Sequence, residues 1–469
     1  MSTPDEPLPT GAFALLGLSA PLCRAVEVLG YAQPTPIQTE SLPPIVAGRD
    51  VLAQARTGTG KTLALAVGLL MRLEPQRPQI QGVVVCPTRE LAEQVGNAVR
   101  RLARFMPNVK LSTLCGGVAL RSQVPSLTPP PHLVVGTPGR LLDHLGRGTL
   151  DFTHVRVLVL DEADRMLDMG FSEPIAQIVG HTPSTRQTLL FSATYPPTIQ
   201  SLSRGLQRSP VEVTVEDAPR AADLEQVFFE VEGAPADRTE AVRGLLLQYR
   251  PESALVFCAT REDTRTLADK LSSFGFPALA LSGELEQRER EEVLVRFSNG
   301  SATVLVATDV AARGLDIDAL GAVIAYELPR DPDVHLHRIG RTGRAGRPGL
   351  ALNLCGPRER VRAEAIAERH GHTLRWSTVA PTSARTVPPA PAPMKTLVIE
   401  AGRQDKLRAG DLLGALCGEV GLKGDDVGQI EVGANRTYVA VRRPRAAEAL
   451  AGLKSGKVKG RTFRVWALP

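Results

Sequence analysis

An acidic turn at the end of a short apolar run constrains the fold of this chain more than any other feature. The run Val157-Leu158-Val159-Leu160 is followed at once by Asp161-Glu162-Ala163-Asp164. Upstream, Gly58-Thr59-Gly60-Lys61-Thr62 has the glycines, the lysine and the hydroxyl of a loop that wraps phosphate groups. Either segment alone also suits an ordinary turn after a buried strand. Together, in this order, they favour a parallel α/β sheet with polar residues at the carboxyl ends of its strands.

Continuous apolar runs alternate with helical patterns through most of the chain. Runs that are apolar at every position indicate parallel strands with helices on both faces of the sheet. The first set of runs is 50–53, 83–86, 133–136, 155–160 and 188–191, and the second is 254–257, 278–281, 303–306, 322–325 and 350–354. We therefore expect two tandem parallel α/β domains of similar size.

Shifts in composition divide the chain into three expected domains. Residues 1–215 form the first α/β domain, the acidic segment 216–223 is a linker, and residues 224–376 form the second domain. Residues 377–394 are a proline-rich linker, which cannot form a core. Residues 395–469 show strand and helix patterns in the order βαββαβ, so we expect a small α+β domain there.

The positive charge of the chain is concentrated in this last segment. Residues 395–469 contain 14 Lys/Arg and 8 Asp/Glu, a net charge of +6, whereas the rest of the chain has 41 basic and 42 acidic residues. A compact basic domain beside a nearly neutral body is typical of an appendage that binds a polyanion. A basic face that only improves solubility would have the same composition, so charge alone leaves both alternatives open.

The composition argues against a membrane protein and against a disulfide or zinc framework. No apolar run approaches the roughly 18 residues of a membrane span, and the first residues lack the pattern of a secretory signal. The six cysteines are scattered without a CxxC pair, which is typical of buried thiols in a reducing compartment. We therefore expect a cytoplasmic protein.

The glycine-rich segment predicts a nucleotide site. Ala55-Arg56-Thr57-Gly58-Thr59-Gly60-Lys61-Thr62 departs from the pattern GxxxxGK[ST] only at its first position. The glycines allow backbone N–H groups to turn inward around phosphate, Lys61 reaches the β- and γ-phosphates, and the Thr62 hydroxyl can ligate Mg²⁺. The helix that begins at Lys61 directs the positive end of its dipole at the same phosphates.

Other charged residues are expected to complete a hydrolytic site. Asp161 is the expected Mg²⁺ partner, and Glu162 is expected to orient and deprotonate the attacking water. In the second domain, the segment that runs from His337 to Arg344 places Arg341 and Arg344 three residues apart, and arginine suits a γ-phosphate because its planar fork matches phosphoryl oxygens. A solvated basic helix is the alternative for this segment.

Gln38 precedes the glycine-rich segment and bears on which nucleotide is bound. An amide both accepts and donates hydrogen bonds, which suits the N6/N7 edge of adenine and mismatches guanine. Gln38 therefore favours ATP over GTP, although most glutamines simply lie at the surface.

Taken together, these motifs resemble those of the DEAD-box RNA helicases of superfamily 2 over residues 13–372. Besides the segments already described, the resemblance is carried by Phe13, Pro87–Leu91, Gly116-Gly117, Thr137–Arg140, Ser192–Thr194, Val256–Cys258, Gln287–Arg290 and Ala307–Asp316. Membership would imply two RecA-like domains that hydrolyse ATP with Mg²⁺ and act on RNA.

The resemblance implies roles for individual residues. Phe13 should stack on adenine, Gln38 should contact its edge, and Asp316 should contact the ribose. Ser192, Thr194 and His337 should couple the nucleotide site to domain closure. Contacts with the RNA backbone are implied for Arg89, Gly117, Thr137 and Arg140 in the first domain and for Thr308 in the second. For Arg89 an ordinary salt bridge at a helix start is an equal alternative.

The last domain resembles that of the bacterial DEAD-box protein A subfamily, an RRM-like fold. The match lies in residues 397–414 and in Lys457-Val458-Lys459-Gly460-Arg461. It implies a monomer that acts on hairpin 92 of 23S rRNA in large-subunit assembly intermediates, with no DNA or membrane partner. Val398 stands where such a domain usually has a stacking aromatic, so basic residues should do more of the binding. The expected contacts are Lys406, Arg408, Tyr438, Lys457 and Lys459.

Two other classes of function share parts of this pattern. A processive DNA translocase has the same pair of α/β domains, but Gln38, the DEAD sequence and the RRM-like last domain argue against this class. An RNA clamp that is gated by ATP and hydrolyses it little is disfavoured by the intact Glu162, Arg341 and Arg344. RNA-stimulated turnover of ATP separates the clamp from the helicase.

Overall fold

The computed structural model describes residues 11–55, 59–215, 224–232, 234–312, 320–343, 349–371, 373–379 and 388–469. They form two compact units, one within residues 11–215 and the other within residues 224–469. Four predicted site residues, Thr57, Gly58, Asp316 and Arg344, lie outside the described residues, as does the expected linker 216–223. No helix in the described part of the chain is long and apolar enough to span a membrane.

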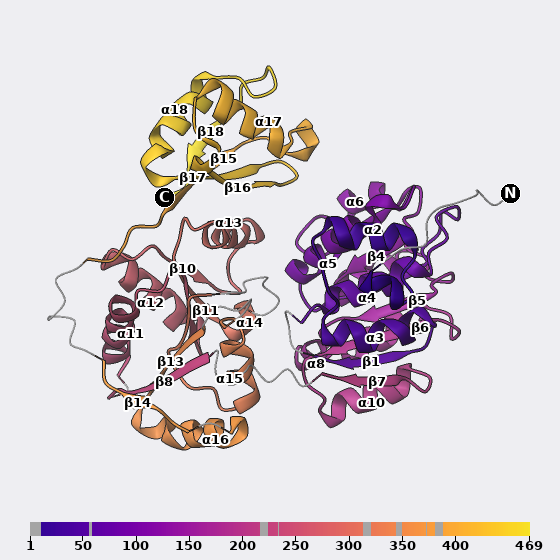
Figure 1. The fold of residues 1–469 in the computed structure, drawn as a ribbon, viewed down its shortest axis with the longest axis horizontal. Helices are drawn as coiled ribbons and strands as arrows, with labels where there is room; N and C mark the ends of the chain where they lie inside the picture. The colour runs from indigo at the N-terminus through magenta and orange to yellow at the C-terminus, as the bar shows by residue number, and fades with distance from the viewer. Residues whose placement is uncertain are drawn as a thin grey trace. The chain divides into compact units, whose positions relative to one another are not determined.

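A seven-stranded parallel sheet is the centre of the first unit (Figure 1). Its strands are β1 (Val51–Gln54), β2 (Gly82–Val85), β3 (Leu111–Leu114), β4 (Leu133–Gly136), β5 (Val157–Leu160), β6 (Gln187–Ser192) and β7 (Val211–Thr214), in the order β3-β4-β2-β5-β6-β1-β7. Because all of them run in one direction, the segments that follow β1, β5 and β6 meet at the same edge. That edge therefore carries the glycine-rich segment, the acidic turn and Ser192–Thr194.

Helices cover both faces of this sheet, as the continuous apolar runs predict. They are α1 (Ala12–Leu15), α2 (Ala20–Val28), α3 (Pro36–Val46), α4 (Lys61–Met71), α5 (Arg89–Leu102), α6 (Leu120–Gln123), α7 (Pro138–Gly146), α8 (Ala163–Asp168), α9 (Ser172–Gly180) and α10 (Pro197–Leu206). Val157 and Val159 pack with residues of α2 to α5, whereas Leu158 and Leu160 pack with residues of α7 to α10. Alternate side chains of one strand thus enter two separate cores.

The second unit repeats this plan. Its parallel sheet has the order β10-β11-β9-β12-β13-β8-β14. The strands are β8 (Leu224–Glu230), β9 (Ala254–Cys258), β10 (Ala278–Leu281), β11 (Val304–Thr308), β12 (Ala322–Ala325), β13 (Gly349–Cys355) and β14 (Trp376–Ser377). The helices are α11 (Pro235–Tyr249), α12 (Arg261–Ser273), α13 (Gln287–Ser298), α14 (Asp309–Ala312), α15 (Pro332–Ile339) and α16 (Arg360–His370).

A small antiparallel sheet completes the second unit. Its strands β15 (Met394–Ile399), β16 (Val427–Val432), β17 (Thr437–Arg442) and β18 (Val465–Ala467) have the order β16-β17-β15-β18, with helices α17 (Ala409–Gly414) and α18 (Ala446–Ser455). The order along the chain is βαββαβ, as expected. The predicted fold class is confirmed: two RecA-like parallel sheets followed by a small α+β domain.

Candidate nucleotide and RNA sites

The start of α3 holds the described part of the glycine-rich loop. Gly60 has a φ of +96°, which favours glycine, and it precedes α4 directly. Its carbonyl oxygen accepts a hydrogen bond from Gln38 Nε2 at 3.0 Å, and the Thr59 carbonyl oxygen accepts one from Thr35 Oγ1 at 2.7 Å. A Cβ on Gly60 would lie 2.4 Å from Gln38 Nε2, so this approach needs a glycine. Gln38 therefore contacts the loop itself.

Gln38 and Phe13 are both buried. The Gln38 side chain is buried, and its Oε1 accepts from the Thr35 backbone N–H at 3.0 Å, which closes a capping box at the start of α3. Phe13 is 5% exposed and belongs to the core that also contains Leu22. The Gln38 amide uses one Nε2–H and one Oε1 lone pair in these bonds, which leaves one of each for a base.

Lys61 and Asp161 are both buried at the sheet edge, and their opposite charges interact. Lys61 is 6% exposed, and its Nζ has no hydrogen-bond partner among the described residues. Burial raises the pKa of Asp161 to about 6, against the opposing effect of the Lys61 ammonium. An unpartnered buried ammonium beside a carboxylate that is costly to ionise suits a site completed by phosphate and a divalent cation. The residues present therefore fit ATP with Mg²⁺, with Thr62 at the second position of α4 as the other predicted Mg²⁺ ligand.

Glu162 is held in place by the acidic turn. It has a φ of +51°, in the left-handed region, and its backbone N–H donates to Asp161 Oδ1 at 3.0 Å. Its Oε2 accepts from Arg165 Nη1 at 2.8 Å within a pair of buried side chains. A non-glycine residue in this conformation is strained, and such strain is found at functional sites. Arg165 was not among the predicted residues, although it lies one helical turn after Glu162.

Asp164 connects the acidic turn to the end of β6. Its Oδ2 accepts hydrogen bonds from the backbone N–H of Thr194 at 2.9 Å and from Thr194 Oγ1 at 2.8 Å. Ser192 Oγ donates to the Thr194 carbonyl oxygen at 2.7 Å, and the Ser192 carbonyl oxygen accepts from the Ala55 N–H at 3.0 Å. A continuous set of hydrogen bonds thus joins the three predicted segments. Sequence reasoning assigned no role to Asp164, although its place as the third acidic residue of the turn was a usable signal.

The predicted RNA contacts of the first unit gather around one glycine loop. Gly117 has a φ of +79°, and a Cβ on it would lie 1.7 Å from Arg89 Nη1, so the Arg89 guanidinium lies directly against this loop. Arg140 Nη2 donates to the Val118 carbonyl oxygen at 2.9 Å from the other side. Thr137 is the N-cap residue of α7, the helix that carries Arg140. The four predicted residues are therefore neighbours at strand and helix ends.

In the second unit, a buried arginine connects two of the predicted segments. Arg338 donates to both carboxylate oxygens of Asp309, at 2.7 Å each, and to the Glu327 carbonyl oxygen. Thr308 immediately precedes Asp309 at the end of β11, and its Oγ1 accepts from the Ala311 N–H at 3.3 Å. Arg338 and Asp309 were not predicted. Of the remaining candidates, His337 is exposed on α15, and Arg341 follows Gly340, the C-cap residue of that helix.

In the last domain, three predicted basic residues lie together and Tyr438 does not join them. Lys459 Nζ donates to the Lys406 carbonyl oxygen at 3.1 Å and lies 3.5 Å from Asp411 Oδ2, which also accepts from the Arg408 N–H. All three basic residues are exposed, as is Lys457, whose N–H donates to Glu419 at 3.3 Å. Tyr438, by contrast, is 6% exposed.

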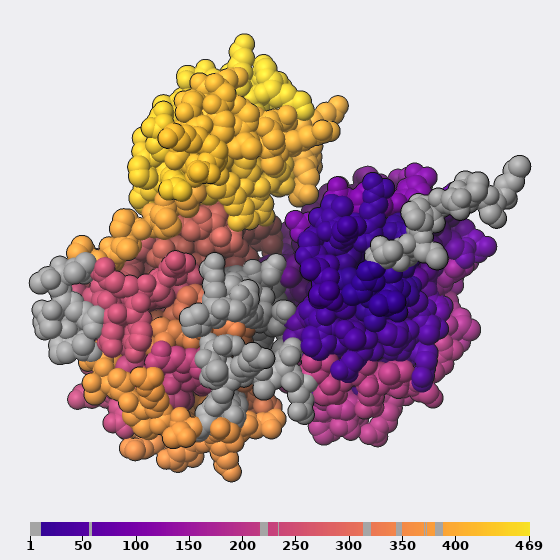
Figure 2. Space-filling view, viewed as in Figure 1, coloured from indigo at the N-terminus to yellow at the C-terminus, as the bar shows by residue number. Residues whose placement is uncertain are grey.

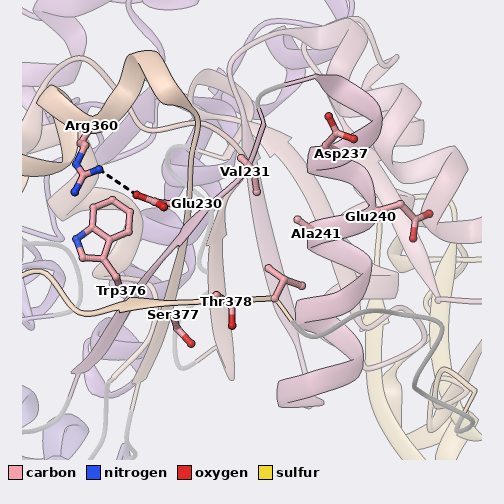
Figure 3. A pocket seen from close by; sticks show the side chains of 10 residues that line it. Glu230, Val231, Asp237, Glu240, Ala241, Arg360, Trp376, Ser377 and Thr378 are labelled. Atoms are coloured by element: carbon pink, nitrogen blue, oxygen red, sulfur yellow. Dashed lines mark hydrogen bonds and ion pairs between the residues drawn. The ribbon is translucent and has the colours of Figure 1, made fainter.

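A cavity of about 720 Å³ lies elsewhere in the second unit (Figure 3). Glu230, Asp237 and Glu240 line it together with Trp376, and Arg360 pairs with Glu230 at 3.3 Å beside the Trp376 ring. None of the predicted site residues contributes to its wall. This cavity therefore lies apart from the predicted site residues.

Comparison with known proteins shows which family the chain belongs to. Residues 35–202 match the DEAD/DEAH box helicase family, residues 237–346 the helicase conserved C-terminal domain, and residues 396–467 the DbpA RNA binding domain. The chain is 48% identical to the ATP-dependent RNA helicase DbpA of Escherichia coli (strain K12), over 97% of this chain and 99% of that protein. It is 41% identical to the DEAD-box ATP-dependent RNA helicase CshA of Geobacillus kaustophilus (strain HTA426), over 74% of each chain.

Solved structures agree with this family. Saccharomyces cerevisiae Dbp5 bound to RNA and ADP BeF3 superposes with a TM-score of 0.71 at 28% identity, and the match covers 79% of this chain and 96% of that one.

Proposed function

The chain belongs to the DEAD-box ATP-dependent RNA helicases and carries a DbpA-type RNA-binding domain, and from this we propose that it locally unwinds 23S rRNA around hairpin 92 during assembly of the large ribosomal subunit. The proposal rests on how much of the chain is similar to DbpA. Similarity to CshA covers 74% of the chain, whereas similarity to DbpA covers 97% and includes the basic last domain. In this proposal, residues 395–469 therefore determine which RNA the protein binds.

The proposed ATP site lies at the edge formed by β1, β5 and β6. Thr57 to Gly60 and Lys61 bind the phosphates, Thr62 and Asp161 hold Mg²⁺, and Glu162 orients the attacking water. The bound cation supplies positive charge against the phosphate oxygens. Arg341 and Arg344 come from the other RecA-like domain, so hydrolysis requires closure of the two domains. Lys61 Nζ, which has no hydrogen-bond partner in the part of the chain that the structure describes, supports this assignment.

In this proposal the helicase domains bind the RNA backbone, so their binding does not depend on the base sequence. Arg89, Gly117, Thr137 and Arg140 contact the backbone from the first domain and Thr308 from the second. Exposed Lys406, Arg408, Lys457 and Lys459 hold the target RNA from the last domain. We propose that the protein acts in the cytoplasm as a monomer, with domain boundaries at residues 215, 224, 376 and 395.

The test is ATP turnover with two fragments of 23S rRNA of equal length that carry or lack hairpin 92. We expect half-maximal stimulation at a lower concentration of the fragment with the hairpin, and loss of that difference after truncation at Pro393. Equal stimulation of the full-length protein by both fragments would contradict the proposed target. ATP binding without RNA-stimulated turnover would instead support the clamp.

A further inference from the structure

Exposed arginines from two separate helices lie together at one edge of the first RecA-like domain. We call them the arginine cluster, and its members are Arg24 of α2, Arg100 and Arg101 of α5, and Arg104 of the 3₁₀ helix η1 (Ala103–Phe105). Figure 1 shows α2 beside α5. In Figure 2 the indigo atoms near the N-terminus adjoin purple atoms of later helices on the surface of this unit. The cluster is therefore assembled by the fold.

The segment that carries most of the cluster lacks carboxylates. Between Glu93 and Asp143 the chain has six Lys/Arg and no Asp or Glu. Arg24, Arg101 and Arg104 form no salt bridge with another residue that the structure describes. A surface with charges of one sign raises the local concentration of ligands of the opposite sign. The arginine cluster therefore suits a polyanion.

Contacts with uncharged groups restrict three of these guanidinium groups. The Arg24 and Arg104 guanidinium carbons lie 4.4 and 5.1 Å from the centroid of the Phe105 ring. Arg100 Nη2 donates to Thr113 Oγ1 at 3.0 Å. Such contacts limit the side-chain rotamers without offsetting the charge, so less entropy is lost when a phosphate binds.

Arg100 and Arg104 also line a cavity of about 270 Å³. Val99, Met106 and Val109 contribute apolar wall to the same cavity. The planar fork of arginine matches phosphoryl oxygens, and the apolar wall suits the carbon atoms of a sugar. The cavity therefore has the chemistry of a contact with a sugar-phosphate backbone.

Strand β3, at the edge of the sheet, connects the cluster to the predicted RNA contacts of this domain. Arg100 contacts Thr113 on β3, and four residues later the chain reaches the loop of Gly117. At about 3.3 Å per residue, Thr113 and Gly117 are at most roughly 13 Å apart. Glu90 and Glu93 lie toward the start of α5, whereas the arginines lie at its end. RNA that leaves the Gly117 loop along β3 can therefore reach the cluster.

An acidic protein surface is the other partner that this charge would suit. The cluster consists of arginine alone, the residue whose fork binds phosphate with two hydrogen bonds. Its position beside β3 also makes it continuous with the predicted RNA contacts. Both observations favour RNA over an acidic protein.

We propose that the arginine cluster is a second RNA-contact surface, which binds backbone phosphates of RNA that extends beyond the strand held at Gly117. It contacts phosphate and sugar, so it adds affinity for long RNA without selecting a base sequence. The path between the two surfaces rests on the proposed RNA contacts at Gly117, whereas phosphate binding by the cluster does not.

The test compares Arg101→Glu/Arg104→Glu with Arg49→Glu/Arg204→Glu, which makes the same change of charge at exposed positions of the first unit away from β3. Fluorescence anisotropy measures the affinity of the full chain for two single strands that lack hairpin 92, with a non-hydrolysable ATP analogue present. One strand has about 6 nucleotides, within the usual size of one site, and the other has about 20.

Arg101→Glu/Arg104→Glu should bind the long strand at least about tenfold more weakly and the short strand within about twofold of the wild type. The salt dependence for the long strand should become shallower by about 1.4, since each lost contact removes about 0.7. The control pair should change neither affinity by more than about twofold. Unchanged affinity for the long strand would overturn the proposal and leave the cluster to an acidic protein, and an equal loss for both strands would overturn it too.

Two further variants make these outcomes decisive. ATP binding reports folding, and if the double reversal fails to bind ATP, Arg101→Gln/Arg104→Gln decides instead, with an expected loss of at least about threefold for the long strand alone. Gly117→Ala tests the predicted loop separately. If Gly117→Ala changes neither affinity while the cluster variants weaken the long strand, the proposed RNA contacts at Gly117 fail and the arginine cluster stands.

Discussion

At the residue scale, the nucleotide site depends on charged groups that the fold buries before any ligand is bound. Lys61 has no hydrogen-bond partner within the described residues, and Asp161 is ionised at a cost that burial imposes. Glu162, by contrast, already has Arg165 as its partner. Binding and chemistry should therefore respond to different substitutions.

Lys61→Ala and Glu162→Gln should separate these two steps. Loss of Lys61 removes a charged contact with phosphate and should weaken ATP binding roughly 10- to 100-fold. Glu162→Gln keeps the shape of the side chain, so ATP should bind normally while turnover falls about 10²- to 10⁴-fold. Equilibrium binding of a fluorescent ATP analogue and single-turnover hydrolysis measure the two effects, with the exposed Glu173→Gln as control. Normal turnover by Glu162→Gln would remove Glu162 from its role.

The raised pKa of Asp161 predicts a pH dependence of Mg²⁺-nucleotide binding. With a pKa of about 6, Asp161 is protonated below that pH, whereas a Mg²⁺ ligand must be ionised. Binding then releases a proton, so affinity for Mg²⁺-ADP should fall as pH drops through about 6 and level off above it.

Calorimetric titrations between pH 5 and 8 check this expectation. ADP itself titrates in this range, so Asp161→Asn is the matched control and should retain only the dependence of the nucleotide. The same pH dependence in both proteins would show that Asp161 does not titrate there.

At the element scale, function is concentrated where strands end and helices begin. Gly60 and Gly117 have positive φ values and lie against Gln38 and Arg89, respectively. Each glycine lets a polar side chain from another element reach the backbone. Loops placed by a rigid sheet in this way are the usual positions for binding residues.

Gly117→Ala should weaken RNA binding without affecting ATP. A methyl group at φ +79° is strained by about 1–2 kcal/mol and would displace the Arg89 guanidinium, so RNA affinity should fall roughly 5- to 30-fold. Gly146→Ala is the control, because Gly146 lies in α7 with open space around it. Fluorescence anisotropy with single-stranded RNA measures the change, and an unaltered affinity would place the RNA contact elsewhere.

At the scale of the whole molecule, a neutral helicase core is joined to a basic domain. Phosphate contacts by lysine and arginine make affinity depend on salt, with a slope of about 0.7 per contact for single strands. The net charge of +6 in residues 395–469 should therefore govern how steeply RNA affinity falls with salt.

Truncation after Pro393 should make that slope shallower while RNA-stimulated ATP hydrolysis persists, because every ATP motif precedes residue 372. The truncated chain needs Val295→Ser, since α13 would otherwise expose an apolar side chain. Titrations of both proteins with one RNA at two salt concentrations give the slopes. Equal slopes would mean that the last domain makes no net contribution through its charge.

Sequence alone was sufficient for most of the central strands and for the motifs, because both are local. Strands buried on both faces are apolar at every position, and the P-loop and acidic turn need particular residue types at short spacing. Strands β3, β7 and β8 escaped prediction because polar residues interrupt each of them and their burial is incomplete. Strand β14 escaped prediction because it has only two residues.

Only the tertiary structure decided which residues form hydrogen bonds with partners far away in the sequence. The bonds from Asp164 to Thr194 and from Arg338 to Asp309 join residues about 30 positions apart, and the pairing of Thr396 with Asn299 spans 97. Tyr438, a predicted RNA contact, is 6% exposed and belongs to the same buried cluster as Val295. No local sequence pattern encodes such partners, because they depend on how separate elements pack. A polar or aromatic side chain can be satisfied by water or by a protein partner, so its residue type does not show which of the two it contacts.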